Sequence, residues 1–124
     1  MENLNIPKTK YTLMINFNVE TGVFEMSGSS YPENAMEFFQ PIIKFIKSYV
    51  SEIGKAIVLN LELNYLNTSS TKCLLDIIEI LEKYYKESGD VKVNWYYEEE
   101  DEDILEMGED IAEDIELPIN LISY

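Results

Sequence analysis

The sequence predicts an α/β domain: a mixed sheet of about four to five strands, opened by an N-terminal hairpin, with helices packed on it. Apolar and polar residues alternate at 11–19, which is the period of a half-buried strand. A second alternating segment at 56–63 and a third at 91–97 flank a helical pattern, which is typical of a strand-helix-strand unit. The 124 residues lie within the range of one domain, so residues 1–124 are expected to form a single unit.

The N-terminal hairpin is predicted from two alternating segments and a turn. Turn residues at 20–22 separate the strand at 11–19 from a shorter apolar alternation at 23–26. We therefore expect two antiparallel strands that end near Gly28. The residues expected on the apolar face of the first strand are Tyr11, Leu13, Ile15, Phe17 and Val19.

A helical region is predicted to follow the hairpin. Pro32 suits the first turn of a helix. The N–H groups of that turn have no acceptor within the helix, so proline, which has no N–H, costs no hydrogen bond there. Pro41 lies inside the same pattern and is expected to kink or break the helix, which would restart at Ile42. The second piece is expected to end at Gly54.

The strand-helix-strand unit is the best-defined part of the pattern. The strand at 56–63 is expected near the sheet centre, and the polar stretch at 64–71 leads into a helix that ends at 88–90. The next strand, at 91–97, is then expected to pair with the first in parallel through a right-handed crossover.

The C-terminal region is predicted to be an acidic helix and an edge strand. Residues 98–116 hold 12 of the 24 acidic residues and no Lys, yet their apolar residues keep helical spacing. We interpret this segment as an acidic amphipathic helix. Residues 117–122 are expected to be extended at a sheet edge, where Pro118 is tolerated.

Composition excludes several classes of function. The chain has no His, and its nine positive charges are all Lys, which excludes His-dependent catalysis, His-ligated zinc and arginine fingers. A net charge of -15 disfavours binding to nucleic acid and to anionic membranes. The single Cys73 cannot form an intrachain disulfide and is expected to be structural. We expect a cytoplasmic protein without an export signal or membrane insertion.

The hydroxyl cluster from Thr68 to Thr71 is the main candidate site. It precedes a helix, where unpaired N–H groups can hold an anion, so it is open to two interpretations: helix capping or a phosphate-related role. The acidic run at 98–103 lacks the ligand spacing of a calcium loop. It is interpreted as a solvated face or a docking surface for basic groups, and we expect no metal and no cofactor.

Several motifs together resemble the SiaC family of bacterial regulatory phosphoproteins, in order from about residue 11 to the end. The segments that carry the resemblance are Ser29–Asn34, Phe38–Phe39 with Pro41–Ile42, Tyr65–Ser70 with Lys72, Trp95–Glu98, Asp101–Asp103 and Gly108–Asp110. The resemblance implies a STAS-type fold in which the helix after a central strand begins with a phosphorylatable hydroxyl.

Within that resemblance, Thr68 matches the phosphorylated threonine of the family. Leu66 stands where the family commonly has an aromatic residue, which leaves the hydroxyls intact. The residues expected to flank the phosphosite or to bind a partner are Tyr65, Asn67, Ser69, Ser70 and Lys72.

The resemblance also implies a partner-switching circuit rather than an enzyme. Its partners would be a SiaB-type protein kinase, a SiaA-type PP2C phosphatase and a SiaD-type diguanylate cyclase, which the unphosphorylated form would bind and activate in c-di-GMP signalling and biofilm control. Two alternatives remain open: an acidic docking adaptor, and an anti-sigma factor antagonist with a different output partner. A divalent-metal-dependent enzyme is a remote alternative, because His, Arg and a Gly-rich phosphate loop are all missing.

Overall fold

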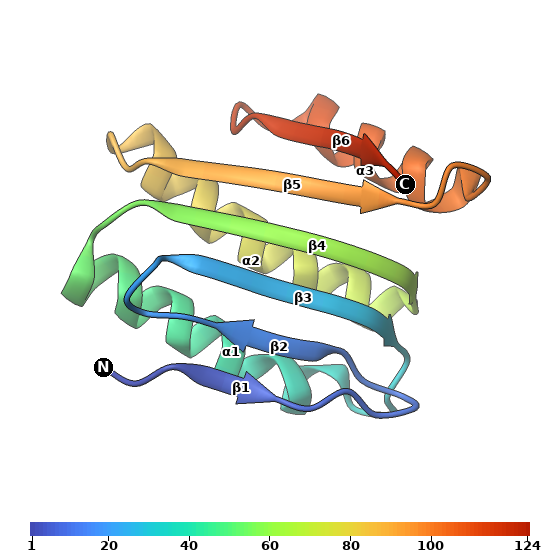
Figure 1. Ribbon diagram of the computed structural model, residues 1–124, viewed down its shortest axis with the longest axis horizontal. Coiled ribbons are helices and arrows are strands. Elements are labelled where there is room, and N and C mark those ends of the chain that lie inside the picture. Colours follow the sequence, from blue (N-terminus) through green and yellow to red (C-terminus); the bar gives the residue numbers. More distant parts are fainter.

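The computed structural model describes residues 1–124 as a mixed sheet with three long helices (Figure 1). The elements in chain order are β1 (Leu4–Ile6), β2 (Met14–Phe17), β3 (Val23–Ser30), α1 (Ala35–Ser48), the π-helical turn η1 (Tyr49–Ile53), β4 (Ile57–Leu66), α2 (Thr68–Lys86), β5 (Val91–Tyr97), α3 (Glu102–Asp114) and β6 (Ile119–Ser123). The strands lie in the order β1-β2-β3-β4-β5-β6. β1, β2 and β3 pair antiparallel, and β3 to β6 pair in parallel. No helix has an apolar stretch of the length needed to cross a membrane.

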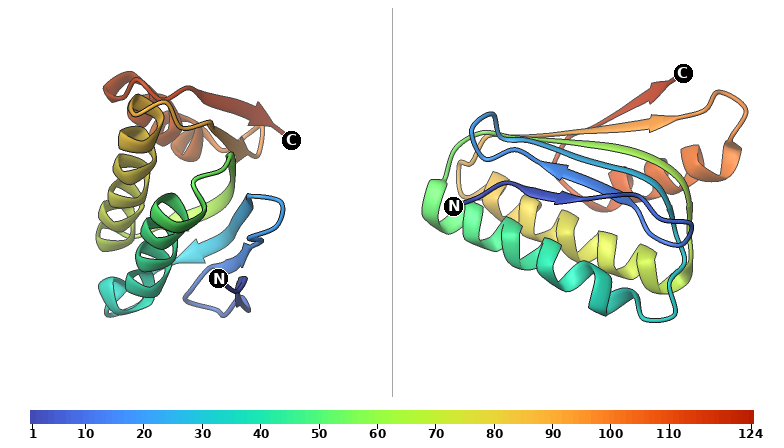
Figure 2. Two further views of the ribbon diagram at one scale, coloured as in Figure 1. Left: turned by 90° about the vertical axis from the view of Figure 1, so that its left-hand side faces the viewer. Right: turned by 60° about the horizontal axis from the view of Figure 1, so that its bottom comes forward.

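The three helices cover one face of the sheet and leave the other face open (Figure 2). The alternation within the strands explains this arrangement, since every second residue of β4 from Ile57 to Leu63 is buried. On the open face, a row of asparagines crosses three strands. The Asn94 amide donates to Asn60 at 2.9 Å, and the Asn120 amide donates to Asn94 at 3.1 Å. These bonds join side chains that the parallel register places side by side.

The core lies between the sheet and the helices. Phe17 and Phe24 stack with ring centroids 4.7 Å apart, and the Tyr49 ring packs edge-on against Phe24 at 5.1 Å. At the other end of the sheet, Trp95 is fully buried beneath α3, and its indole Nε1 donates to the Ile104 carbonyl at 3.0 Å. The acidic helix is therefore anchored to the core.

The N-terminal prediction was correct in its hairpin and wrong in its extent. β2 and β3 are antiparallel, as expected, but β2 covers only Met14–Phe17, and Tyr11 lies in the preceding loop with 51% of its surface exposed. The sheet has six strands rather than four to five. The strand that the prediction missed is β1, a three-residue edge strand paired with β2.

The helical region after the hairpin also differs from the prediction. The first helix begins at Ala35 and not at Pro32, because the Asn34 side chain accepts from the Glu37 N–H and caps the helix. Pro41 does not break the helix, which continues to Ser48. The carbonyl that Pro41 leaves unpaired belongs to the exposed Glu37, where water can satisfy it.

The remaining elements confirm the prediction. β4 and β5 are parallel and flank α2, and the acidic segment forms α3 over a shorter span than residues 98–116. β6 is an edge strand that begins directly after Pro118, as expected. The predicted end of the helical region at Gly54 is also correct, since Gly54 follows η1 in the left-handed conformation with φ 64°.

Replacing Gly108 by alanine is expected to destabilise the protein. An ideal Cβ at this position would lie 2.7 Å from the Trp95 Nε1 and 2.9 Å from the Leu121 Cδ2, so α3 would have to move away from the sheet. We expect the free energy of unfolding to fall by about 1–3 kcal/mol. Thermal unfolding of Gly108→Ala beside the exposed-site control Glu109→Ala tests this. Equal melting temperatures for the two variants would contradict the packing described here.

Candidate functional site

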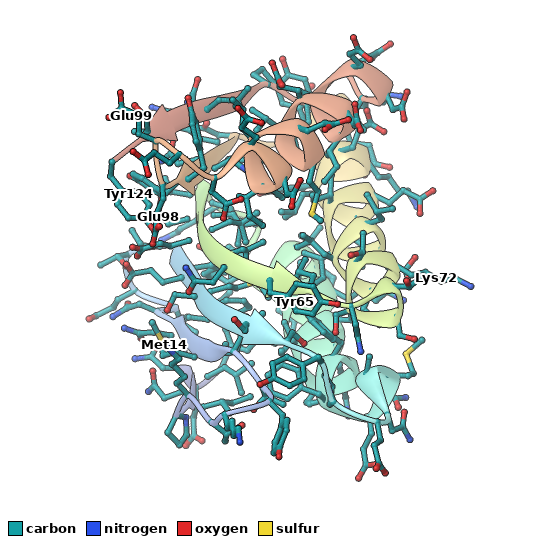
Figure 3. The ribbon with its side chains drawn as sticks, turned by 90° about the vertical axis from the view of Figure 1, so that its right-hand side faces the viewer. Met14, Tyr65, Lys72, Glu98, Glu99 and Tyr124 are labelled. Carbon is teal, nitrogen blue, oxygen red and sulfur yellow. The ribbon has the colours of Figure 1, made fainter.

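The candidate site lies at the carboxyl ends of the parallel strands, where β3 and β4 end and α2 and α3 begin. Figure 3 looks onto this end of the sheet, with Tyr65 near its centre and Lys72 pointing outward from α2. The carboxyl ends of parallel strands meet there, which is where open α/β sheets usually place their binding sites. Only Asn67 separates the end of β4 from the first residue of α2.

Asn67 is the residue that caps α2. Its side-chain oxygen accepts from the Ser70 N–H at 2.9 Å, and its own N–H donates to the Ser30 carbonyl at 2.9 Å. Asn67 therefore joins the start of α2 to the end of β3. The interpretation of the hydroxyl cluster as the helix cap was therefore wrong. Asn67 is the cap, and Thr68 is already the first helical residue.

The four hydroxyls from Thr68 to Thr71 have different surroundings. Ser70 is fully buried, and its Oγ lies 2.7 Å from the Oγ of the equally buried Ser30. The Thr71 hydroxyl donates to the Asn67 carbonyl at 3.0 Å. Thr68 and Ser69 are exposed, and neither hydroxyl makes a hydrogen bond within the protein. The site thus offers two accessible hydroxyls instead of four.

The electrostatics at the start of α2 favour a negative group. The first N–H groups of an α-helix have no acceptor within it, and the positive end of the helix dipole points toward Thr68. The first turn of α2 has no acidic residue, and Lys72 stands four residues after Thr68 with its side chain exposed. A phosphoryl group on Thr68 would therefore be compatible with the folded helix.

An exposed aromatic cluster lies beside this helix start. The Tyr31 ring packs edge-on against Tyr11 at 5.3 Å and against Tyr65 at 6.0 Å. Their exposed fractions are 51% for Tyr11, 37% for Tyr31 and 55% for Tyr65. The sequence named Tyr65 as a candidate but not its two neighbours: Tyr11 was expected on the apolar face of the first strand, and Tyr31 directly precedes the predicted helix start at Pro32. Large exposed aromatic rings are typical of protein-protein contact surfaces.

Cys73 lies outside the accessible site. It is a free, buried thiol on the inner face of α2. Burial raises the pKa of the Cys73 thiol, and the nearby Asp76 raises it further, whereas Lys72 lowers it. A thiol in these surroundings is mainly protonated and unreactive.

The acidic run after β5 does not form a cluster of ligands. No group of three or more Asp, Glu or Cys side chains converges on a point that could hold a metal ion. The hollow at 98–103 is open and lined by carboxylates alone. Its Asp101 side chain accepts from the Ile104 N–H at 3.1 Å and caps α3.

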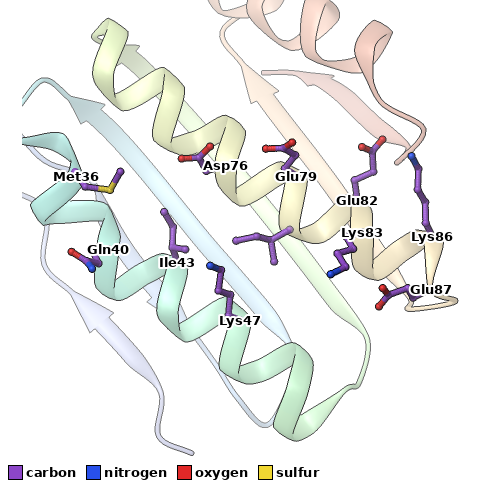
Figure 4. A pocket seen from close by; sticks show the side chains of 11 residues that line it. Met36, Gln40, Ile43, Lys47, Asp76, Glu79, Glu82, Lys83, Lys86 and Glu87 are labelled. Carbon is purple, nitrogen blue, oxygen red and sulfur yellow. The ribbon is translucent and has the colours of Figure 1, made fainter.

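A hollow of about 970 Å³ lies between α1 and α2 (Figure 4). Its lining carries charges of both signs: Lys47, Lys83 and Lys86 line it together with Asp76, Glu79, Glu82 and Glu87. These charges of opposite sign compensate one another, so the hollow shows no preference for one kind of charged partner.

Fold and site together define a mixed α/β domain whose accessible hydroxyls stand at the start of the helix after a central strand. The model of the SiaC family regulatory phosphoproteins matches residues 6–124. The chain therefore belongs to the SiaC family.

Comparison with known proteins agrees with this assignment. An uncharacterized protein of Pseudomonas aeruginosa strain UCBPP-PA14 is 35% identical over 124 residues, which is all of this chain and 98% of that protein. Apo-SiaC from Pseudomonas aeruginosa has a TM-score of 0.92 at 33% identity, covering 98% of this chain and 99% of that one. The structure of the diguanylate cyclase SiaD in complex with its activator SiaC, from the same organism, contains a chain with a TM-score of 0.94 at 33% identity and the same coverage.

Proposed function

We propose that this protein is a phosphorylation-controlled activator of a diguanylate cyclase and has no catalytic activity of its own. Its unphosphorylated form binds and activates the cyclase, and a phosphoryl group on Thr68 prevents that binding. A SiaB-type kinase adds the group and a SiaA-type PP2C phosphatase removes it. The proposal is supported by the SiaC of Pseudomonas aeruginosa, an activator found in complex with SiaD, to which this chain is 33% identical.

The exposure of Thr68 is the observation that carries the proposal. Thr68 is the first residue of α2, and its hydroxyl has no partner within the protein, so a kinase can reach it. Ser70 and Thr71 are unsuitable as phosphate acceptors, because both hydroxyls are already hydrogen-bonded. The Ser70 hydroxyl bonds to Ser30 at the end of β3, and the Thr71 hydroxyl donates to the Asn67 carbonyl. Ser69 is the one neighbour with comparable access.

The proposed switch acts on the surface and leaves the fold unchanged. A phosphoryl group carries about -1.5 to -2 charges at neutral pH, and the start of α2 can accommodate that charge. Tyr65 and Tyr31 lie beside this point and expose their rings. A partner that covered the rings would have to strip water from the phosphoryl group, which costs several kcal/mol without a well-placed cation.

Thr68→Ala is expected to abolish most phosphate incorporation by a cognate SiaB-type kinase. Asn67 supplies the cap of α2, so the variant should stay folded. Its free energy of unfolding should lie within about 0.5 kcal/mol of the wild-type value. Ser69→Ala is the matched control and should be phosphorylated as the wild type is. Mass spectrometry locates the modified residue. Wild-type incorporation in Thr68→Ala, with loss in Ser69→Ala, would move the site to Ser69.

A further inference from the structure

The open face of the sheet carries a cavity of about 440 Å³ that has no part in the proposed switch. It extends from β2 to the residue that follows β6, across four neighbouring strands. Figure 3 shows two of its residues, Met14 and Tyr124, on the side of the sheet opposite α2. The side chains that give the cavity its chemical character are Met14, Glu25, Ser27, Glu62, Tyr96 and Tyr124.

The strand register places the two carboxylates of this cavity close together. Ser27 pairs with Glu62 across β3 and β4, and Glu25 pairs with Asn60. Glu25 and Glu62 are therefore diagonal neighbours, with Cα atoms about 8 Å apart from the usual strand spacing and rise. The Asn60 side chain accepts from the Asn94 amide at 2.9 Å, so the residue beside Glu25 is held in position.

Neither carboxylate has a positive partner within the protein. The one salt bridge of the chain joins Lys86 to Glu116, and no lysine lines the cavity. The negative field reaches the rim of the cavity. Burial raises the pKa of the Tyr124 hydroxyl, and the carboxylates of Glu62 and Glu98 raise it further. A cavity with this field repels anions and attracts cations.

Two tyrosines and a methionine add surfaces that suit a hydrocarbon chain. Tyr96 is half-buried, and Tyr124 exposes 52% of its surface. The aromatic pairs of the chain and its one lysine–ring contact all involve other residues, so neither ring is engaged by a second ring or by a cation. Tyrosine rings attract ammonium groups, and the flexible thioether of Met14 packs against methylene groups of varied shape.

We propose that this cavity binds a small aliphatic diamine, with one ammonium group at Glu25 and the other at Glu62. The separation of the two residues is close to the extended length of a diamine with five carbons. The hydroxyl oxygen of Ser27 accepts from an ammonium N–H, and the methylene chain lies against Tyr96 and Tyr124. The proposal goes beyond the proposed function and does not depend on it, because the cavity faces away from α2.

Other cations fit the cavity less well. No group of three or more acidic side chains converges on one point, so a single metal ion would lack ligands. A quaternary ammonium ion has no N–H to donate to the carboxylates. A lysine side chain of a partner protein has one ammonium group and would neutralise either Glu25 or Glu62, but not both. A linear diamine satisfies both carboxylates at once.

Titration with two matched amines tests the proposal. The probes are cadaverine, a linear diamine with five carbons, and n-pentylamine, which has the same chain and one ammonium group. At physiological salt, which screens general attraction to an acidic protein, calorimetry should give one cadaverine site per chain. Pentylamine should bind at least about tenfold more weakly, because it forms one charge-assisted contact instead of two. Equal affinities for the two amines, or no cadaverine binding, would overturn the proposal.

Neutral substitutions then locate the site. Glu25→Gln and Glu62→Gln should each weaken cadaverine binding at least about tenfold. Glu109→Gln is the matched control, because it makes the same change of charge at an exposed residue of α3 outside the cavity. It should bind within about twofold of the wild type. Equal weakening by all three variants would show that cadaverine responds only to the net charge of the protein.

The methionines report the position of the bound amine. Met14 lines the cavity, whereas Met107 stands among the carboxylates of α3 and Met36 lines the hollow between α1 and α2. With methyl-labelled protein, cadaverine should shift the NMR signal of Met14 and leave those of Met107 and Met36 in place. Magnesium chloride, which brings the same charge without the hydrocarbon chain, should shift none of the three. A cadaverine shift of Met107 as large as that of Met14 would contradict a specific site on the open face.

Discussion

A chain that lacks residues 98–124 is expected not to fold. The deletion removes α3 and β6, which cover the fully buried Trp95 and accept its indole N–H at the Ile104 carbonyl. Burying a tryptophan removes about 150–250 Å² from water, which is about 4–6 kcal/mol at 25 cal/mol per Å². That single loss is comparable to the total stability of a typical domain, about 5–15 kcal/mol.

Fluorescence of the one tryptophan measures this effect directly. In the full chain Trp95 should emit as a buried indole and shift to longer wavelength in a cooperative thermal transition. In the truncated chain it should emit as a solvated indole at 25 °C. A truncated chain with buried-indole emission and the full-length melting temperature would show that the acidic segment is a dispensable tail.

Phosphorylation of Thr68 is expected to weaken cyclase binding by more than about a hundredfold. A cost of 3 kcal/mol suffices for this factor, and it corresponds to the lower range for burying a dianion without a cation in contact. Lys72 is the nearest lysine in sequence, but its side chain points outward from α2 (Figure 3). The far-UV circular dichroism and melting temperature should be unchanged, because the modified residue begins a helix whose first turn has no acidic residue.

Two variants separate a specific block from general loss of function. Thr68→Ala removes the acceptor hydroxyl, so it should bind the cyclase as the unmodified protein does even after incubation with the kinase. Tyr65→Ala should weaken binding of the unmodified protein, because it removes an exposed ring that lies beside the proposed contact. Isothermal titration calorimetry with the purified cyclase measures both. Loss of binding in Thr68→Ala without kinase treatment would contradict the proposed role of the unmodified surface.

The spacing of apolar residues was sufficient to predict those helices and strands that pack against the core along their whole length. The unit from β4 to β5 and the acidic α3 have apolar residues at strand or helix spacing, and the structure confirms each of them. β1 has only three residues and is held by backbone pairing with β2, so no period could reveal it. The start of α1 was missed because Asn34 provides a side-chain cap, which outweighed the preference of Pro32 for a first turn.

The candidate site was predictable in position but not in detail. The hydroxyls of the cluster look equivalent in the sequence, and only the fold brings Ser30 to Ser70 across 40 residues and buries both. The same applies to the tyrosine cluster, since Tyr11, Tyr31 and Tyr65 come from three separate segments. The distinction between exposed and buried hydroxyls depends on these contacts between distant residues.

The central claim is that the modification state of Thr68 decides whether the protein activates its partner. It is tested by measuring binding and c-di-GMP synthesis of a cognate diguanylate cyclase with unmodified and phosphorylated protein, side by side at one salt concentration. The account predicts tight binding and activation by the unmodified form, and neither by the phosphorylated form. Equal binding and equal activation by the two forms would contradict it and leave Thr68 as an exposed residue at a helix start.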